Sequence, residues 1–164
     1  MLGELIAASS LPEPQWWVEA YVARARPLEG ESNYSPRGGP LVGAYEGPLW
    51  RLVDERVPAA IKADKDVRWA CQEWYSGAYL LETMPSVLYI LSRHAHDPEE
   101  AVVRAVNDTK DNDTIAAIVG AAMGALHGEA AFPRHWRENL LGRTCEDDDG
   151  KLLELLESAE QAFA

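Results

Sequence analysis

Apolar residues recur along this chain every three or four positions, as they do on one face of a helix. Neither the alternation of apolar and polar residues that marks a half-buried strand nor an internal repeat is present. The expected elements are a helix that begins after Ser10, helices over 51–62, 66–75, 83–94 and 133–141, one from Asp97 to an acidic loop at 107–114, and a last one from Asp148 or Asp149. The pattern predicts an all-α fold, a compact multi-helix bundle, with residues 1–164 forming a single domain.

Glycine and proline cluster between residues 27 and 49, which are predicted to form a long loop. A loop of this length in a compact domain is usually functional or mobile. Two of its residues, Tyr34 and Tyr45, have rings that could stack on an adenine base, as aromatic side chains do when they bind nucleic acid. The loop is therefore a candidate for contact with a ligand.

An apolar stretch at 115–126 follows the acidic loop, and small residues line one face at four-residue spacing: Ala116, Gly120, Gly124 and Gly128. Larger apolar side chains occupy the other faces, so we expect a buried helix. Each glycine inside a helix costs about 1 kcal/mol relative to alanine, and we expect close packing against another backbone to offset that cost. Because a membrane span needs roughly 20 residues, this stretch is too short to cross a bilayer.

The loop NDTKDNDT at 107–114 brings together three carboxylates and two hydroxyls: Asp108, Asp111, Asp113, Thr109 and Thr114. Hard oxygen donors at this density repel one another unless water or a cation relieves them, and Mg²⁺ prefers such ligands. The alternative is that Asp113 or Thr114 caps the following helix and its neighbours form a solvated turn. A calcium EF-hand is excluded, because counting from Asp108 or from Asp111 gives neither the glycine at the sixth place nor the glutamate at the twelfth.

Three segments carry a family resemblance: WYSGAYLLETMPSVLYIL at 74–91, NDTKDNDTIAAIVGAAMGALHG at 107–128 and FPRHW at 132–136. They resemble, in order, a glycine-containing helix start, an Asp-x-Asp-Thr signature and a Pro-x-x-Trp of the ADP-ribosylglycohydrolases, which include the dinitrogenase-reductase-activating glycohydrolases. The likeness covers about residues 66–143. It implies packed α-helices and a two-magnesium site that hydrolyses the N- or O-glycosidic bond of ADP-ribose attached to a side chain.

The resemblance also implies roles for single residues and Mg²⁺ as the cofactor, as two ions. The family's second set of metal ligands is matched by Asp111, Asp113 and Thr114. The segment that lies near the substrate's ribose and phosphates is matched by Ser76, Gly77 and Tyr79. Asp108 has no constant counterpart and is expected to support the metal ligands from behind. No residue is assigned as general acid or base.

Two other family features, a Thr-Asp-Asp cluster and an early Gly-Asp-Ala-x-Gly segment, have no counterpart in these 164 residues. The chain is therefore expected to correspond to the C-terminal half of such an enzyme, with further metal ligands coming from outside it. Either the chain is a fragment, or a complementing chain or a homo-oligomer supplies the rest, or catalysis has been lost.

The acidic composition of the chain limits the classes of macromolecule that it can bind. A net charge of −12 and a pI near 4.7 argue against nucleic acid and anionic membrane surfaces. The N-terminus lacks the basic start of a signal peptide, and Cys71 and Cys145 form neither a metal pair nor a disulfide framework. These observations predict a cytoplasmic protein.

Three functions fit these observations. The first is hydrolysis that removes ADP-ribose from a protein or from an ADP-ribose-containing small molecule. The second is non-catalytic binding of ADP-ribose, or an immunity-type role that blocks an ADP-ribosylating toxin. The third is a helical structural protein whose acidic loop caps a helix. The four histidines are expected to lie at helix ends or on the surface rather than at a metal: His94, His96, His127 and His135.

Overall fold

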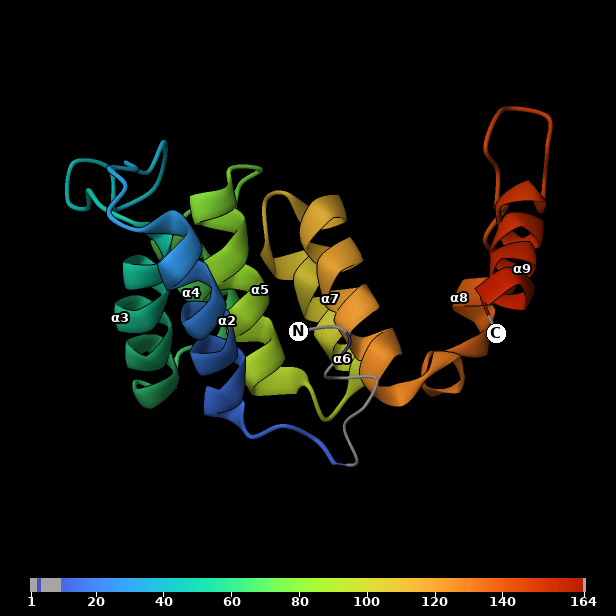
Figure 1. The fold of residues 1–164 in the computed structure, drawn as a ribbon, viewed down its shortest axis with the longest axis horizontal. Coiled ribbons are helices and arrows are strands. Elements are labelled where there is room, and N and C mark those ends of the chain that lie inside the picture. Colours follow the sequence, from blue (N-terminus) through green and yellow to red (C-terminus); the bar gives the residue numbers. More distant parts are fainter. Residues whose placement is uncertain (1–2, 4–9, 164) are drawn as a thin grey trace. The chain divides into compact units, whose positions relative to one another are not determined.

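The computed structural model describes residue 3 and residues 10–163. The chain divides into two compact units, Met1–Ala131 and Phe132–Ala164 (Figure 1). The described residues form eight α-helices and one short 3-10 helix without a strand, and Tyr34 and Gly47 form an isolated antiparallel bridge. The predicted all-α fold is confirmed, whereas the expectation of a single domain stays a prediction.

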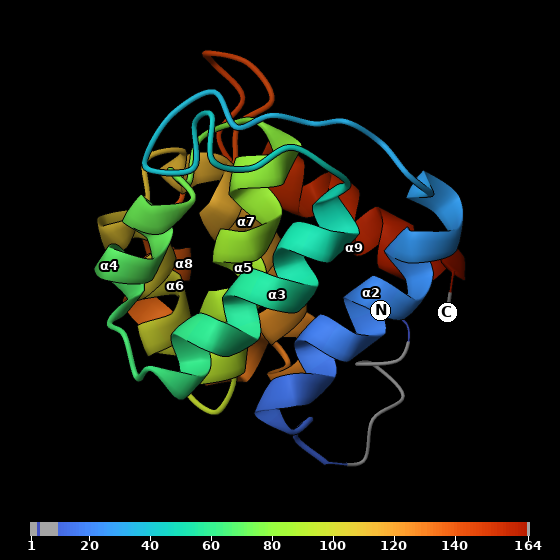
Figure 2. The same ribbon diagram turned by 90° about the vertical axis from the view of Figure 1, so that its left-hand side faces the viewer.

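Helix α5 (Leu80–His94) is the centre of the first unit. Between Leu81 and Ser92 every side chain except Met84 is buried. Figures 1 and 2 show α5 with the other helices of the unit around it. The helices that pack against it are α2 (Pro14–Glu29), α3 (Leu49–Lys62), α4 (Val67–Glu73), α6 (Pro98–Asp108) and α7 (Asn112–His127).

The predicted loop at 27–49 is shorter than expected, because α2 continues through Pro27 to Glu29 and α3 begins at Leu49. The carboxylate of Glu29 accepts hydrogen bonds from the backbone N–H groups of Leu49 (2.6 Å) and Trp50 (3.1 Å). Glu29 thereby satisfies the free N–H groups at the start of α3, which has no cap of its own. This tertiary cap fixes both ends of the loop.

The predicted start of α6 at Asp97 is confirmed, whereas α2 begins at Pro14 with no side-chain cap, later than the start expected after Ser10. Asp97 precedes α6, and its Oδ1 accepts from the N–H of Glu100 (3.0 Å). Asp66 precedes α4 and accepts from the N–H of Trp69 (2.7 Å). Local signals therefore placed these helix starts, whereas α5 begins at Leu80, three residues before the expected position.

The prediction of all-round burial for the glycine-striped helix α7 is wrong. One face is buried, through Ile115, Val119, Ala122 and Met123, while Ile118 is 37% exposed. A Cβ at Gly120 would meet only the Cγ2 atom of Val102, at 3.9 Å, which is ordinary van der Waals contact. No close backbone approach therefore requires glycine at this position.

The second unit contains α8 (Arg134–Glu138) and α9 (Lys151–Phe163), and the 3-10 helix Glu129–Ala131 closes the first. Helix α9 begins at Lys151, not at Asp148 or Asp149 as expected, and Asp148 instead stabilises the turn that precedes the helix. Its carboxylate accepts from the hydroxyl and N–H of Thr144 and the N–H of Cys145, which lowers its pKa from 3.8 to about 2. Among the described residues, no helix has the length and apolar character needed to cross a membrane.

Candidate functional site

The predicted metal loop and the predicted substrate segment meet at Ser76. Its carbonyl accepts a hydrogen bond from the N–H of Asp111 (3.0 Å), and its hydroxyl accepts one from the N–H of Lys110 (3.1 Å). Ser76 is only 2% exposed. Two segments that lie far apart in the sequence are therefore fixed to each other at the end of the first unit where α5 and α7 begin (Figure 1).

The turn before α5 has an uncommon backbone conformation. Tyr75 has a φ of +76° and Ser76 a φ of +46°. Residues other than glycine rarely adopt this left-handed region. Such conformations cost of order 1–3 kcal/mol each and cluster at binding and catalytic sites. The hydrogen bonds of Ser76 to the metal loop help to hold the turn in this shape.

A buried carboxylate that the sequence analysis did not single out, Glu82, supports the same turn. Glu82 is 1% exposed, and its Oε2 lies so near Gly77 that a Cβ there would stand 2.5 Å away. The hydroxyl of Thr83 donates to the Gly77 carbonyl (2.9 Å). Gly77 therefore has no room for a side chain, and the first turn of α5 determines its position.

The loop at 30–48 covers this turn through Arg37. The N–H of Arg37 donates to Oε1 of Glu82 (3.2 Å), and its Nη2 lies 3.6 Å from Oε2. The Cζ atom of Arg37 stands 4.2 Å from the centre of the Tyr79 ring, which Tyr34 contacts edge-on at 5.9 Å between centroids. Tyr34 thus lies at the site, while the hydroxyl of Tyr45 donates to the Pro48 carbonyl (2.5 Å).

Asp111 is the residue whose environment points to a ligand. It stands at the N-cap position of α7, but its side chain makes no capping hydrogen bond. Its Oδ2 is buried and has no hydrogen-bond partner among the described residues. A buried carboxylate oxygen without a partner is costly, and a cation would remove that cost. A hard metal ion is the kind of ligand that would satisfy this carboxylate oxygen.

The alternative in which Asp113 or Thr114 caps the helix is wrong. Helix α7 begins at Asn112, so both residues lie inside its first turn. Asp113 is exposed, and its Oδ1 accepts from the N–H of Thr114 (2.9 Å). Because the cap position belongs to Asp111, which does not cap, helix capping leaves its carboxylate unexplained.

The donor set for a metal is incomplete. Within residues 10–163, no three acidic, histidine or cysteine side chains come close enough together to hold a metal ion. Asp111, Asp113 and Thr114 would therefore need water or oxygen donors from elsewhere to fill an octahedral shell.

The remaining carboxylate and the remaining hydroxyl of the acidic loop, those of Asp108 and Thr109, have partners of their own. Asp108 accepts from Arg68 Nε (3.2 Å) with one oxygen and from Arg104 Nη1 (2.9 Å) with the other. The hydroxyl of Thr109 donates to the Ala105 carbonyl (2.6 Å). Asp108 is thus ion-paired with two arginines, and its expected support of the metal ligands stays a prediction.

The histidines of the first unit lie at helix ends remote from this loop, in keeping with the expectation. His127 is at the last position of α7, where its Nε2 lies 2.7 Å from the Ala95 carbonyl. His94 and His96 stack on each other with 6.5 Å between ring centroids, at the end of α5 opposite Gly77. His135 is exposed on α8. The acidic loop is left with oxygen donors.

Sequence comparison agrees with the resemblance that the motifs carry. A family model described as ADP-ribosylglycohydrolase matches residues 6–163, a longer stretch than the expected 66–143. A protein of Archaeoglobus fulgidus, described as uncharacterized, is 36% identical over 103 residues. The match includes 62% of this chain and 32% of that protein, so the matched part spans about a third of the relative's length. No solved structure matches the chain.

Proposed function

The chain belongs to the ADP-ribosylglycohydrolase family, a family of hydrolases, and we propose that it takes part in Mg²⁺-dependent hydrolysis of the glycosidic bond of ADP-ribose. The substrate would be an ADP-ribosylated protein side chain or a related ADP-ribosylated molecule. The observation that supports this most is the buried, partnerless Oδ2 of Asp111, next to a turn fixed by Ser76. We place the protein in the cytoplasm, in keeping with the free thiols of Cys71 and Cys145.

The residues of the site divide the work. Asp111, Asp113 and Thr114 would hold Mg²⁺, which when bound lowers the pKa of a water molecule and orients the ribose hydroxyls. Ser76 ties the metal loop to the turn before α5, so the metal ligands and the substrate segment keep a fixed separation. Pre-organisation of this kind lowers the barrier because less motion is needed to reach the reactive geometry.

Thermal unfolding of the whole chain with and without millimolar Mg²⁺ tests the metal assignment. We expect Mg²⁺ together with ADP-ribose to raise the Tm of the wild type, because a ligand that binds only the folded state stabilises it. Asp111→Ala should abolish that shift. Without Mg²⁺ the same variant should be as stable as the wild type or more stable, because it removes an uncompensated buried carboxylate.

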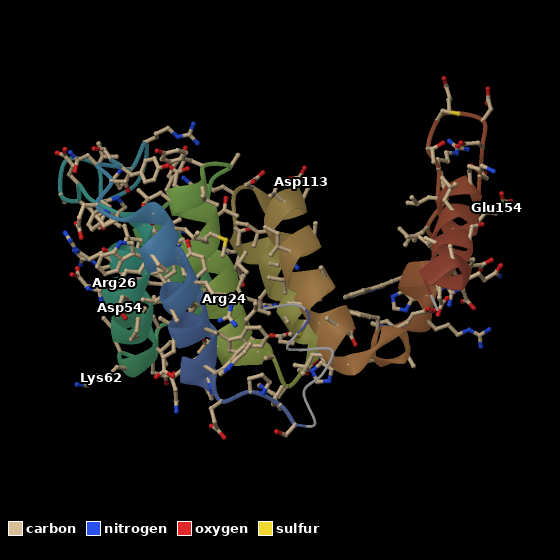
Figure 3. All side chains as sticks on the ribbon, in the orientation of Figure 1. Arg24, Arg26, Asp54, Lys62, Asp113 and Glu154 are labelled. Carbon is tan, nitrogen blue, oxygen red and sulfur yellow. The ribbon has the colours of Figure 1, made fainter. Side chains whose placement is uncertain are left out.

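Asp54→Ala is the matched control, since Asp54 is an exposed acid on α3 that Figure 3 shows well away from Asp113 and the start of α7. It should keep the full shift. If Asp111 instead acted as a helix cap, Asp111→Ala would cost about 0.5–2 kcal/mol without Mg²⁺. That loss of stability, or a wild-type Tm that does not change when Mg²⁺ and ADP-ribose are added, would contradict the metal assignment.

Release of ADP-ribose from a modified protein tests the reaction itself. We expect release by the wild type together with any complementing chain, and none by Asp111→Ala. Binding of ADP-ribose without release would favour the second candidate, a non-catalytic binder or an immunity-type protein that blocks an ADP-ribosylating toxin.

A further inference from the structure

Two cations flank the candidate site although the chain carries a net charge of −12. Arg37 stands over the ring of Tyr79, with its Cζ 4.2 Å from the centroid. Lys110 stands over the ring of Tyr75, with its Nζ 3.5 Å from the centroid. Both rings belong to segment 75–79, which Ser76 ties to the metal loop through the backbone N–H groups of Lys110 and Asp111.

The segments that carry the two cations both contact the ring of Tyr75. The backbone that follows Arg37 runs against Tyr75, since a Cβ at Gly38 would stand 2.7 Å from that ring. Lys110 contacts the same ring with its Nζ, and its backbone N–H donates to the Ser76 hydroxyl. The strained turn therefore presents a positive charge on each of its two rings.

Each cation keeps donors for an anion. The side chain of Arg37 is 61% exposed, and its ion pair with Glu82 is a single contact of 3.6 Å. A guanidinium has five N–H donors and an ammonium three, so neither the Glu82 pair nor contact with a ring exhausts them. Buried Glu82 holds the backbone of Arg37 in place by accepting from its N–H.

We propose that Arg37 and Lys110 form the subsite that binds the diphosphate of the substrate. This inference rests on the proposed function, because it presumes a ligand of the ADP-ribose class. Asp111 and Asp113 repel such an anion, and two nearby cations would offset that repulsion. Charge-assisted hydrogen bonds from Arg and Lys are also the usual means of holding phosphate oxygens.

Isothermal titration of the whole chain in millimolar Mg²⁺ tests the proposal with ADP-ribose, ADP and adenosine as probes. We expect Arg37→Gln and Lys110→Gln each to weaken ADP-ribose and ADP by about tenfold, the usual effect of losing a hydrogen bond to a charged group. Affinity for adenosine, which has no phosphate, should not change. The loss should be larger at low ionic strength than at high, because salt screens exposed charges.

The chain offers matched controls. Arg26 stands over the ring of Trp50 at 4.7 Å and Lys65 over that of Trp69 at 4.4 Å, so both make the same type of contact elsewhere in the first unit. Arg26→Gln and Lys65→Gln should bind ADP-ribose as the wild type does. Lys110→Arg, which keeps the charge, should restore most of the affinity that Lys110→Gln loses.

The outcomes separate this inference from the proposed function. Wild-type binding of ADP-ribose that persists unchanged in Arg37→Gln and Lys110→Gln overturns the subsite alone. Binding that depends on both cations, without any release of ADP-ribose from a modified protein, supports the subsite and rejects hydrolysis. A wild-type chain that binds neither ADP-ribose nor ADP overturns both.

Discussion

Single side chains set the shape of the candidate site, and Gly77 shows how little freedom they leave. A Cβ at Gly77 would stand 2.5 Å from Oε2 of Glu82 and 3.1 Å from Cδ1 of Tyr75. Glu82 is 1% exposed and cannot simply move into solvent. We predict that Gly77→Ala lowers the free energy of unfolding by about 1–3 kcal/mol through overpacking, as measured by urea denaturation.

Gly120→Ala is the matched control for this prediction. Its new Cβ would meet only Val102, at 3.9 Å, and alanine is the better helix former by about 1 kcal/mol. We expect this variant to be at least as stable as the wild type. Equal losses in both variants would show that steric crowding by Glu82 is not what requires glycine at position 77.

The residues of the site differ in how far the sequence reveals them. Asp111 and Gly77 stand in segments whose residue spacing resembles motifs of the family, so the sequence alone pointed to them. Arg37 and Glu82 are 45 residues apart, and nothing local to either indicates the other. Their contact arises only when the loop at 30–48 folds over the start of α5, and sequence periodicity carries no information on such a contact.

At the scale of elements, periodicity and local caps identified the helices. They did not reveal the tertiary contacts that set where a helix starts or which of its faces is buried. The start of α3 is set by Glu29, which belongs to another helix. The hydropathy of α7 predicted burial on all faces, yet only the face toward α5 and α6 is covered in the described chain. The apolar composition of a helix shows that it can be buried. Which of its faces is buried depends on the helices that pack against it.

The C-terminal end of α5 supplies a prediction on pH. A helix C-terminus favours a cationic histidine, but burial lowers the pKa of His94 from its ordinary 6.5. Glu100 raises this pKa, while Arg93 and Arg104 lower it further, so the net direction is down. The folded state therefore binds the proton less tightly than the unfolded chain. The stability that neutral His94 allows is therefore fully present above pH 6.5. It is lost as the pH falls below that value and protonation favours the unfolded chain.

Urea denaturation at neutral and mildly acidic pH measures this effect. We expect His94→Gln to lose less free energy of unfolding than the wild type on going from neutral to acidic pH, because it has no imidazole to protonate. His135→Gln, at an exposed position on α8, should follow the wild type. A His94→Gln profile that coincides with the wild type would contradict the role of burial.

At the scale of the whole molecule, the hydrophobic core belongs to the first unit. Every described hydrophobic side chain that is buried lies between Trp17 and Met123. The site also lies in this part of the chain, with Arg37, Ser76 and Asp111 all before Ala131. Burial of apolar surface is the main driving force for folding, so the first unit contains both the energy for its fold and the residues of its candidate site.

We therefore predict that a chain ending at Ala131 unfolds cooperatively, with a Tm within a few degrees of the full chain and the same response to Mg²⁺. The reason is that removing Phe132–Ala164 takes away no buried hydrophobic side chain among those described. Circular dichroism during heating measures cooperativity, and titration with ADP-ribose checks that the site persists. Loss of cooperative unfolding in the shortened chain would mean that the core depends on the second unit, in keeping with the single domain expected from sequence. Retention of both properties would establish that the fold and the ligand site arise from the same set of helices around α5.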